Sequence, residues 1–414
     1  MEFFADLHLH SKYSRACSKN LDLENLVYWG KFKGVNLFGT GDFTHPAWLA
    51  QLREKLEDNG QGFFRLKNSK EDIYFALTCE ISSIFSRQGT VKRIHYVVMF
   101  PDFASVEKFN QRLSLVAKLS SDGRPITGLD VKNALKLALE VNPDVIFIPA
   151  HIWTPWFSLL GSMSGFNSID EAFEELTEKI YAVETGLSSD PGMNWRLSQL
   201  DRFQIVSFSD AHSPQPHRIG RETTVFELEA PSYFKLQQAL KSPTEKNKIK
   251  MTTEFYPEEG KYHFDGHRLC NVCSSPQESK QNKYLCPVCG RRVTIGVMSR
   301  VEELADRPAN FQPANRPAYK NLVPLTEVIA KLLKTQPITQ KVFKLYFQLI
   351  EAADNEFNLW LGEVDLSQAG LPANIIEGIN KAKAGCLLIK PGFDGEYGVV
   401  ELSSEDKAAP KSLF

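Results

Sequence analysis

Short hydrophobic runs alternate with helical patterns over the first 210 residues. Runs that predict strands cover residues 3–9, 35–41, 73–80, 93–100, 144–150, 180–185 and 203–209. Amphipathic helices are predicted between them, near residues 22–33, 46–57, 105–119, 128–141, 169–178 and 191–201. Strands joined mostly by helices predict an α/β fold, a barrel related to the (βα)₈ type.

One connection departs from this alternation. Residues 81–92 contain Gly89 and show little helical pattern. We therefore expect strands 73–80 and 93–100 to form a hairpin.

Beyond residue 240 the pattern changes, which predicts three domains. Residues 1–240 form the barrel, 241–305 a cysteine-bearing module, and 306–414 a small, mainly helical C-terminal domain. That last domain begins in a Pro- and Asn-rich connector and has predicted helices at 325–334, 338–353 and 372–383. A hairpin of residues 387–392 and 397–402 follows, and then a polar tail.

Composition excludes some partners. The 48 Lys and Arg against 50 Asp and Glu give a net charge of −2, so bulk positive charge does not hold this chain to nucleic acid. No apolar run approaches the ~18 residues of a membrane span, and the N-terminus lacks the features of a signal peptide. We therefore expect a cytoplasmic protein without a membrane partner, in which cysteines are metal ligands or core residues.

Histidines and carboxylates stand at or near the carboxyl end of every predicted strand. They are His8, His10, Asp42, His45, Glu80, His95, His151, Glu184, Asp210 and His212. Alternation along the first strand puts His8 and His10 on the same face, so both can reach one metal ion. In barrels of this kind, active sites lie at the carboxyl ends of the strands.

This set of ligands predicts metal chemistry. Imidazole and carboxylate together suit zinc, manganese or iron, and magnesium accepts carboxylates. About eight ligands exceed what one tetrahedral ion needs, so we expect two or three divalent ions. Clustered divalent ions favour phosphoester hydrolysis, and we expect the residues that hold them to be the catalytic ones.

A simpler interpretation competes with some of these assignments. A lone strand histidine such as His95 is as readily a core residue as a ligand. His45 stands in a loop and is a ligand or a supporting residue, and Glu184 supports a ligand or begins a helix. His217, His263 and His267 lie outside the pattern, and we expect them to be exposed.

The ordered motifs resemble those of the PHP (polymerase and histidinol phosphatase) superfamily. They are Asp6-Leu7-His8-Leu9-His10-Ser11, Gly41-Asp42, Glu80, His95, His151 and Ser209-Asp210-Ala211-His212. The resemblance covers about residues 1–230 and implies a distorted (βα)₇ barrel with a multinuclear metal site. Gly41-Asp42-Phe43 replaces the usual Thr-Asp-His, so Asp42 or His45 supplies that ligand. Arg15, Ala16 and Cys17 stand where many members carry a further ligand.

Four cysteines form two Cys-x-x-Cys pairs, Cys270 with Cys273 and Cys286 with Cys289. Each pair can place two thiolates on one tetrahedral ion, which predicts a structural zinc site. A redox dithiol and coincidental core cysteines are the alternatives. Cys17, Cys79 and Cys386 have no partner at such a spacing, and we expect them to be core thiols.

Positive charge gathers around this module. Residues 241–300 carry a net charge of +5 and residues 301–350 carry +3, whereas residues 1–240 carry −4 and residues 351–414 carry −6. Arg291, Arg292, Arg316 and Tyr319 are candidates for contacting phosphates and stacking on bases. The competing interpretation is a solvated charged surface.

Taken with the order of domains, further motifs make nearly the whole chain similar to the endonuclease Q family. They are residues 39–46, 184–191, 316–319 and 391–397. The resemblance implies incision of DNA 5′ to hypoxanthine, uracil, xanthine or an abasic site. We expect a monomer, with a replication or repair protein as a further partner.

The lesion base must be inspected, and aromatic residues near the predicted site could do so. The candidates for contacting DNA there are Trp153, Trp156, Trp195 and Arg196, unless the aromatic ones simply line the core.

Two other functions compete with a repair endonuclease. A small-molecule phosphatase of the PHP type leaves the zinc module and the basic segment unexplained, and a non-catalytic DNA-binding scaffold leaves the ligand set unexplained.

Overall fold

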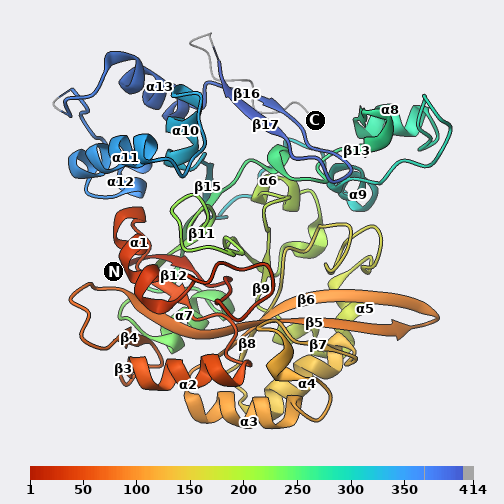
Figure 1. Ribbon diagram of the computed structural model, residues 1–414. Coiled ribbons are helices and arrows are strands. Elements are labelled where there is room, and N and C mark those ends of the chain that lie inside the picture. The colour runs from red at the N-terminus through yellow and green to blue at the C-terminus, as the bar shows by residue number, and fades with distance from the viewer. Residues whose placement is uncertain (368, 404–414) are drawn as a thin grey trace.

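A mixed sheet lies at the centre of the fold in the computed structural model (Figure 1), which describes residues 1–367 and 369–403. The polar tail predicted at the C-terminus therefore lies outside the described residues. All seven predicted strands are present. They are β1 (Glu2–Asp6), β2 (Leu37–Gly39), β5 (Tyr74–Arg87), β6 (Thr90–Phe100), β8 (Ile146–Pro149), β9 (Ala182–Glu184) and β10 (Gln204–Val206).

Hydrogen bonds link these strands into a ring. β1, β2 and β5 pair in parallel, β6 pairs antiparallel with both β5 and β8, and β9 pairs in parallel with β10. Two bonds beyond the strand ends complete the ring: the Ile152 amide donates to the Glu184 carbonyl at 3.0 Å, and the Asp210 amide to the His8 carbonyl at 2.9 Å. Loops that follow β1, β8, β9 and β10 therefore meet at one place.

The predicted hairpin is confirmed, and it is longer than expected. β5 and β6 pair without interruption from Leu77 opposite Phe100 to Arg87 opposite Thr90. Residues 81–92 are thus mostly strand, with the turn at Gln88 and Gly89, both of which have positive φ. The hairpin extends well beyond the rest of the sheet in Figure 1.

Helices connect the strands near the predicted positions. They are α1 (Leu23–Lys33), α2 (Pro46–Lys55), α3 (Phe103–Leu113), α4 (Val131–Val141), α5 (Ile169–Phe173) and α6 (Pro191–Asn194). However, α6 covers only four residues of the predicted 191–201, and α3 ends six residues before the predicted residue 119. Carboxylates cap α1 and α3, where Asp22 and Asp102 accept the amides of Asn25 and Ser105. α5 is shorter than predicted because Glu174 has a φ of 50°, and the chain continues as a 3₁₀ helix.

Among the described residues, six strands that the hydrophobic pattern did not predict enlarge the main sheet. β3 (Leu56–Asp58) pairs with β4 (Phe64–Leu66), and both β4 and β7 (Ile126–Thr127) pair with β5. β11 (Thr223–Glu227) pairs with β1, β12 (Lys248–Glu254) with β11, and β15 (Ala318–Asn321) with β12. β12 lacks a clear hydrophobic pattern because its buried end is polar, with Thr252 and Glu254 hydrogen-bonded to each other. Pairing in the main sheet thus crosses the predicted boundaries at residues 241 and 306.

α7 (Tyr233–Lys241) packs against β12. Apart from β15, the elements that follow β12 pack above this sheet in Figure 1. Those of the cysteine-bearing segment are β13 (Asp265–His267), β14 (Val272–Ser274), α8 (Pro276–Gln281) and α9 (Val297–Leu304). The C-terminal ones are α10 (Leu325–Leu332), α11 (Gln340–Ala353), α12 (Glu356–Leu361), α13 (Ala373–Lys383), β16 (Leu387–Lys390) and β17 (Val399–Leu402). Three of these helices and the β16–β17 hairpin agree with the sequence pattern, which did not predict α12.

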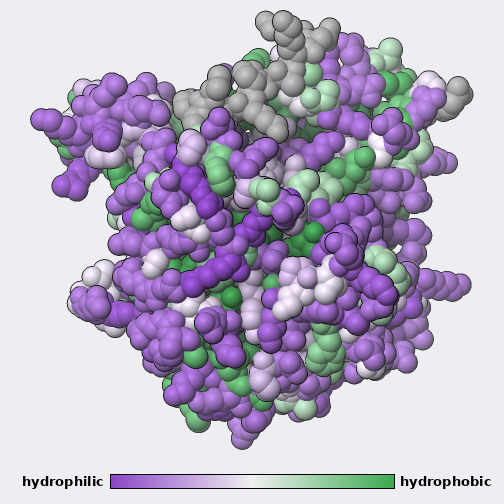
Figure 2. Space-filling view, turned by 180° about the vertical axis from the view of Figure 1, so that it is seen from behind, coloured by the Kyte–Doolittle hydropathy of each residue, from purple (hydrophilic) through white to green (hydrophobic). Residues whose placement is uncertain are grey.

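The outer surface is mostly polar. Figure 2, which views the molecule from behind, shows a largely hydrophilic face with hydrophobic residues in small groups. Within residues 1–367 and 369–403, no helix is long and apolar enough to cross a membrane.

A buried ion pair joins the first helix to the C-terminal helices. The Lys33 ammonium, at the end of α1, donates to Glu356 Oε1 at 2.7 Å and to the Pro216 carbonyl at 3.0 Å. The same Glu356 oxygen accepts the Leu325 amide at 2.9 Å, at the start of α10. Both side chains of the pair are buried, so each charge depends on the other for compensation.

We expect Lys33→Met to lower the free energy of unfolding by about 3–5 kcal/mol, because it leaves the Glu356 carboxylate buried without its partner. Lys31→Met is the matched control in the same helix, since Lys31 pairs with Glu71 at the surface. The control should change stability by less than about 1 kcal/mol. Guanidinium unfolding of both variants measures this, and equal effects would contradict the assigned role of the buried pair.

Candidate metal centre

The loops after β1, β8 and β10 meet the middle of the β5–β6 hairpin and bring two overlapping groups of metal-ligating side chains together. One comprises His8, His10, Glu80 and Asp210, and the other Glu80, His95 and His151. Glu80 and His95 therefore lie within long strands rather than at the carboxyl ends that the sequence pattern predicted. Within each group, one ligand atom per residue lies within 4.8 Å of every other. Glu80 belongs to both groups, so its carboxylate could bridge two neighbouring ions.

Glu80 and His95 meet because of the register of the β5–β6 hairpin. Glu80 lies opposite Val97, and Ser82 lies opposite His95. Since side chains two residues apart share a face of the sheet, Glu80 and His95 are diagonal neighbours. His95 Nδ1 lies 2.6 Å from Glu80 Oε1.

Two buried imidazole nitrogens fit the role of metal ligands. His8 Nε2 and His95 Nδ1 lie close to Glu80, but neither makes a hydrogen bond of acceptable geometry to any described residue, although both are shielded from solvent. Each faces the Glu80 carboxylate, His8 Nε2 at 3.6 Å from Oε2. A buried polar atom without a partner is costly, whereas coordination to a divalent ion would satisfy it.

Two further carboxylates contact the Nδ1 atoms of His8 and His10 and so orient these rings. Glu184 lies 2.9 and 3.0 Å from His8 Nδ1 and accepts the His151 amide at 2.8 Å. Asp42 Oδ1 lies 3.1 Å from His10 Nδ1. A carboxylate on the second ring nitrogen fixes the ring that ligates a metal, so Glu184 and Asp42 are suited to support rather than to ligation.

Three predicted ligands lie outside both groups. Asp42 is held against His10, with its second oxygen accepting from Ser11 and Ser14. His45 stacks on Tyr13 at a ring separation of 4.5 Å and precedes α2. His212 has its ring 4.6 Å from that of His10 and is partly exposed.

Burial alone would raise the pKa of Glu80, but His95, Arg124 and His8 outweigh it and hold that pKa well below its usual range. The pKa values of Asp42 and Asp210 are lowered as well, since contacts with His10 outweigh the burial of each carboxyl group. The carboxylates are therefore ionised, which is the form that binds divalent cations.

Three residues of this site have strained backbone conformations. Asp42, His151 and Asp210 all have positive φ, at 48°, 30° and 47°. Such conformations cost of order 1–3 kcal/mol each and tend to occur at functional sites. Gly186 leaves room for His151, because a Cβ at residue 186 would lie 2.3 Å from the His151 Cβ.

The sequence analysis missed Arg124. Its Nη1 donates to Glu80 Oε2 at 3.0 Å, from a loop between α3 and β7 (Ile126–Thr127). No pattern in the sequence distinguishes this arginine from surface ones, since it belongs to no motif and follows no hydrophobic strand.

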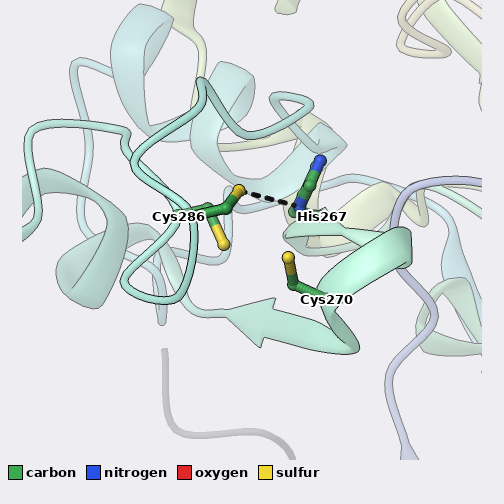
Figure 3. Close-up of side chains that lie close together, drawn as sticks. His267, Cys270 and Cys286 are labelled. Carbon is green, nitrogen blue, oxygen red and sulfur yellow. Dashed lines mark hydrogen bonds between the residues drawn. The ribbon is translucent and has the colours of Figure 1, made fainter.

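The cysteine module gathers a different set from the predicted four cysteines. His267, Cys270, Cys286 and Cys289 offer ligand atoms within 4.8 Å of one another. Figure 3 shows the first three of these side chains lying close together. Cys273 lies outside the set, and its Sγ lies 4.0 Å from the Pro391 carbonyl. The reason is strand alternation: Cys273 pairs with Gly266 and His267 with Val272, so Cys273 and His267 occupy opposite faces of the β13–β14 hairpin.

Two other expectations about histidines are wrong. His217 and His263 are buried rather than exposed. Burial lowers the pKa of each to about 3, so both are neutral side chains within the fold. His267, expected to be exposed, is half-buried in the cysteine set.

The structure places two predicted DNA-contacting residues in the interior. Trp153 is fully buried, with its Nε1 donating to Asn194 Oδ1 at 2.8 Å, so it is a core residue. Trp195 is also buried, against the half-buried Tyr319. Arg316 is half-buried rather than interior, and it donates to the Phe203 carbonyl at 2.8 Å.

The other candidates lie nearer the surface. Arg291 and Arg292 are exposed, and Trp156 is half-buried beside Tyr262 at a ring separation of 5.5 Å. Arg196 has two guanidinium nitrogens that are buried and, among the described residues, lack a hydrogen-bond partner.

Comparisons with known proteins extend over the whole chain. No family model matches the sequence. The uncharacterized protein YqxK of Bacillus subtilis is 30% identical over 97% of this chain and 99% of its own length. The uncharacterized protein MJ0043 of Methanocaldococcus jannaschii is 30% identical over 64% of this chain, and the match spans only 34% of that longer protein.

Two solved structures are similar throughout. The lesion-specific endonuclease PfuEndoQ from Pyrococcus furiosus superposes with a TM-score of 0.86 at 30% identity, covering 99% of this chain and 98% of its own. Endonuclease Q in complex with a 27-mer duplex that has an abasic lesion at the active site gives a TM-score of 0.85 at 30% identity, with both chains fully covered.

A mixed α/β fold with clustered imidazole and carboxylate ligands defines the class of metal-dependent hydrolases. Within that class, the chain belongs to the endonuclease Q family and is an endonuclease.

We expect Glu184→Gln to weaken binding of divalent metal about 10- to 100-fold, because the amide holds the His8 ring less firmly than the carboxylate does. Calorimetric titration of the metal-free protein with Mn²⁺ measures the change. Glu175→Gln, at an exposed ion pair with Lys132, is the control and should leave affinity unchanged. An unchanged affinity in Glu184→Gln would contradict the orienting role.

A separate test concerns the cysteine set. We expect His267→Ala to lower the zinc content of the purified protein and Cys273→Ala to leave it unchanged, because only His267 lies with the other three ligands. Elemental analysis after dialysis measures zinc per chain. The opposite result, with zinc lost only on changing Cys273, would restore the four-cysteine set.

Proposed function

We propose that this chain is a metal-dependent DNA repair endonuclease that hydrolyses the phosphodiester 5′ to a deaminated base or an abasic site. End-to-end likeness to the endonuclease Q complex with an abasic duplex carries the proposal. The buried cluster around Glu80 supports it, since these ligands suit phosphoester hydrolysis.

In this proposal, residues 1–240 form a distorted (βα)₇ barrel of the PHP type. Residues 241–305 form a module around one structural zinc ion, and residues 306–414 a small, mainly helical domain. The ring of strands, with ligands in the loops after β1, β8 and β10, supports the first assignment. Closely spaced thiolates beside His267 support the second.

Two divalent ions, zinc, manganese or magnesium, would be held by the two overlapping groups that share Glu80. When bound, such ions polarise the phosphoryl group and stabilise the charge that develops on it. His212, Asp42 and His45 lie outside these two groups, so the two groups account for two ions rather than three. Glu184 and Asp42 keep the imidazoles of His8 and His10 in position.

DNA would contact the basic part of the zinc module. Arg291, Arg292, Lys280 and Lys283 are exposed there and can bind phosphates without reading sequence. The lesion nucleotide would leave the duplex, at a lower cost where its base is mispaired or missing. Trp156, beside Tyr262 in the loop that follows His151, is the aromatic candidate for stacking on the flipped base.

A small-molecule phosphatase of the PHP type is the competing function. It accounts for the metal ligands but leaves the exposed arginines of the module without a role. Nicking of lesion-bearing duplexes and hydrolysis of p-nitrophenyl phosphate distinguish the two functions. Fast monoester hydrolysis without duplex nicking would favour the phosphatase.

We expect the double variant Asp210→Ala with His212→Ala to lose duplex nicking while it still binds the same duplex, because the change removes ligands and leaves the basic module intact. Nicking gels on duplexes with hypoxanthine, uracil or an abasic site measure activity, and fluorescence anisotropy measures binding. Asp170→Ala, at an exposed ion pair with Arg202, is the control. Nicking by the double variant at the wild-type rate would refute the site.

Removal of metal gives a second test. EDTA should abolish nicking, and excess Mn²⁺ should restore it, because the Glu80 cluster depends on divalent ions. Persistent nicking after exhaustive chelation would contradict a metal-dependent mechanism.

A further inference from the structure

Arg124 reaches the ligand cluster from its solvent side. Its Nη1 donates to Glu80 Oε2 at 3.0 Å, yet its side chain is 31% exposed, whereas that of Glu80 is 0% exposed. The guanidinium thus extends from the buried Glu80 carboxylate toward solvent. Asp210 and His212 are both partly exposed as well.

The loop around Arg124 is fixed from both sides. The Gly123 amide donates to the Tyr13 carbonyl at 3.1 Å, and the Gly123 carbonyl accepts from Thr44 Oγ1 at 3.0 Å. The Pro125 carbonyl accepts the Ser82 amide at 3.0 Å. A Cβ on residue 123 would lie 2.3 Å from Asp42 Oδ2, so glycine allows the loop to approach the cluster this closely.

A second arginine beside the cluster, Arg221, already uses its donors on a backbone carbonyl. Arg221 donates through Nε and Nη2 to the Ser209 carbonyl at 3.0 and 2.9 Å, immediately behind Asp210. Arg124 uses one guanidinium nitrogen on Glu80 and retains donors for another acceptor. A phosphodiester at the partly exposed Asp210 would lie beside the carboxylates of Asp210 and Glu80, and the Arg124 guanidinium next to them would offer it cationic donors.

We propose that Arg124 is a catalytic residue whose guanidinium donates hydrogen bonds to the scissile phosphate. This inference rests on the proposed endonuclease function. A planar guanidinium with paired donors matches the geometry of a phosphate and stabilises charge that develops on its oxygens. The competing role is structural: Arg124 would only balance the buried charge of Glu80.

Single-turnover nicking of an abasic duplex at saturating enzyme separates these roles. We expect Arg124→Gln to lower the rate about 10²- to 10³-fold. Its metal content, from elemental analysis, and its affinity for the duplex in EDTA should remain within about threefold of wild type. Arg124→Lys should recover part of the rate, and millimolar guanidinium should accelerate Arg124→Ala but not wild type. Arg15→Gln is the matched control, since Arg15 contacts Asp122 of the same loop and is 79% exposed.

Two results would overturn the inference while leaving the proposed function intact. One is nicking by Arg124→Gln within about threefold of wild type. The other is loss of bound metal in proportion to loss of rate, without rescue by lysine or guanidinium, which would assign Arg124 the structural role. Failure of the wild-type protein itself to nick the duplex would instead refute the proposed function, and the inference with it.

Discussion

The buried carboxylate of Glu80 is the constraint on which the site depends. It lies on the long strand β5 with no exposed surface, and an ionised carboxylate there would cost several kcal/mol if it were alone. His8, His10, His95, His151 and Arg124 surround it. Because both ligand groups share this residue, its loss would separate them. Three residues with positive φ, Asp42, His151 and Asp210, lie in the loops around this charge.

The sequence predicted most of this centre because strand alternation and the β5–β6 hairpin both place ligands in it. Alternation along a strand gave His8 and His10 a common face, and the predicted hairpin brought Glu80 and His95 together. Position relative to a strand end could not distinguish a ligand from its support. Asp42 stands in a motif that predicts metal binding, yet its oxygens contact Ser11, Ser14 and His10. Whether such a carboxylate ligates a metal or supports a ligand depends on how the loops fold, which the sequence pattern does not show.

Other features escaped prediction for reasons specific to each residue. Arg124 enters the site from a connecting loop, where no periodicity governs side-chain direction. His267 precedes the first cysteine pair, and strand alternation favours it over Cys273. β12 was missed because its buried polar groups satisfy one another: Glu254 accepts from Ser207 and Thr252, which removes the hydrophobic signal that marks an interior strand.

The basic residues of 241–350 are of two kinds. Some, such as Arg300, make contacts within the fold, and others, such as Arg291, are exposed to solvent. The chain leaves the sheet after β12 and returns at β15, and these strands are hydrogen-bonded neighbours. Arg300 is buried and donates to the carbonyls of Leu160 and Phe166, in the loop that follows His151. Local charge therefore overstates the positive surface available to DNA, because Arg300 and Arg316 serve packing. The same contacts tie the cysteine-bearing segment to the loop that follows His151, so they fix the position of the exposed arginines relative to the Glu80 cluster.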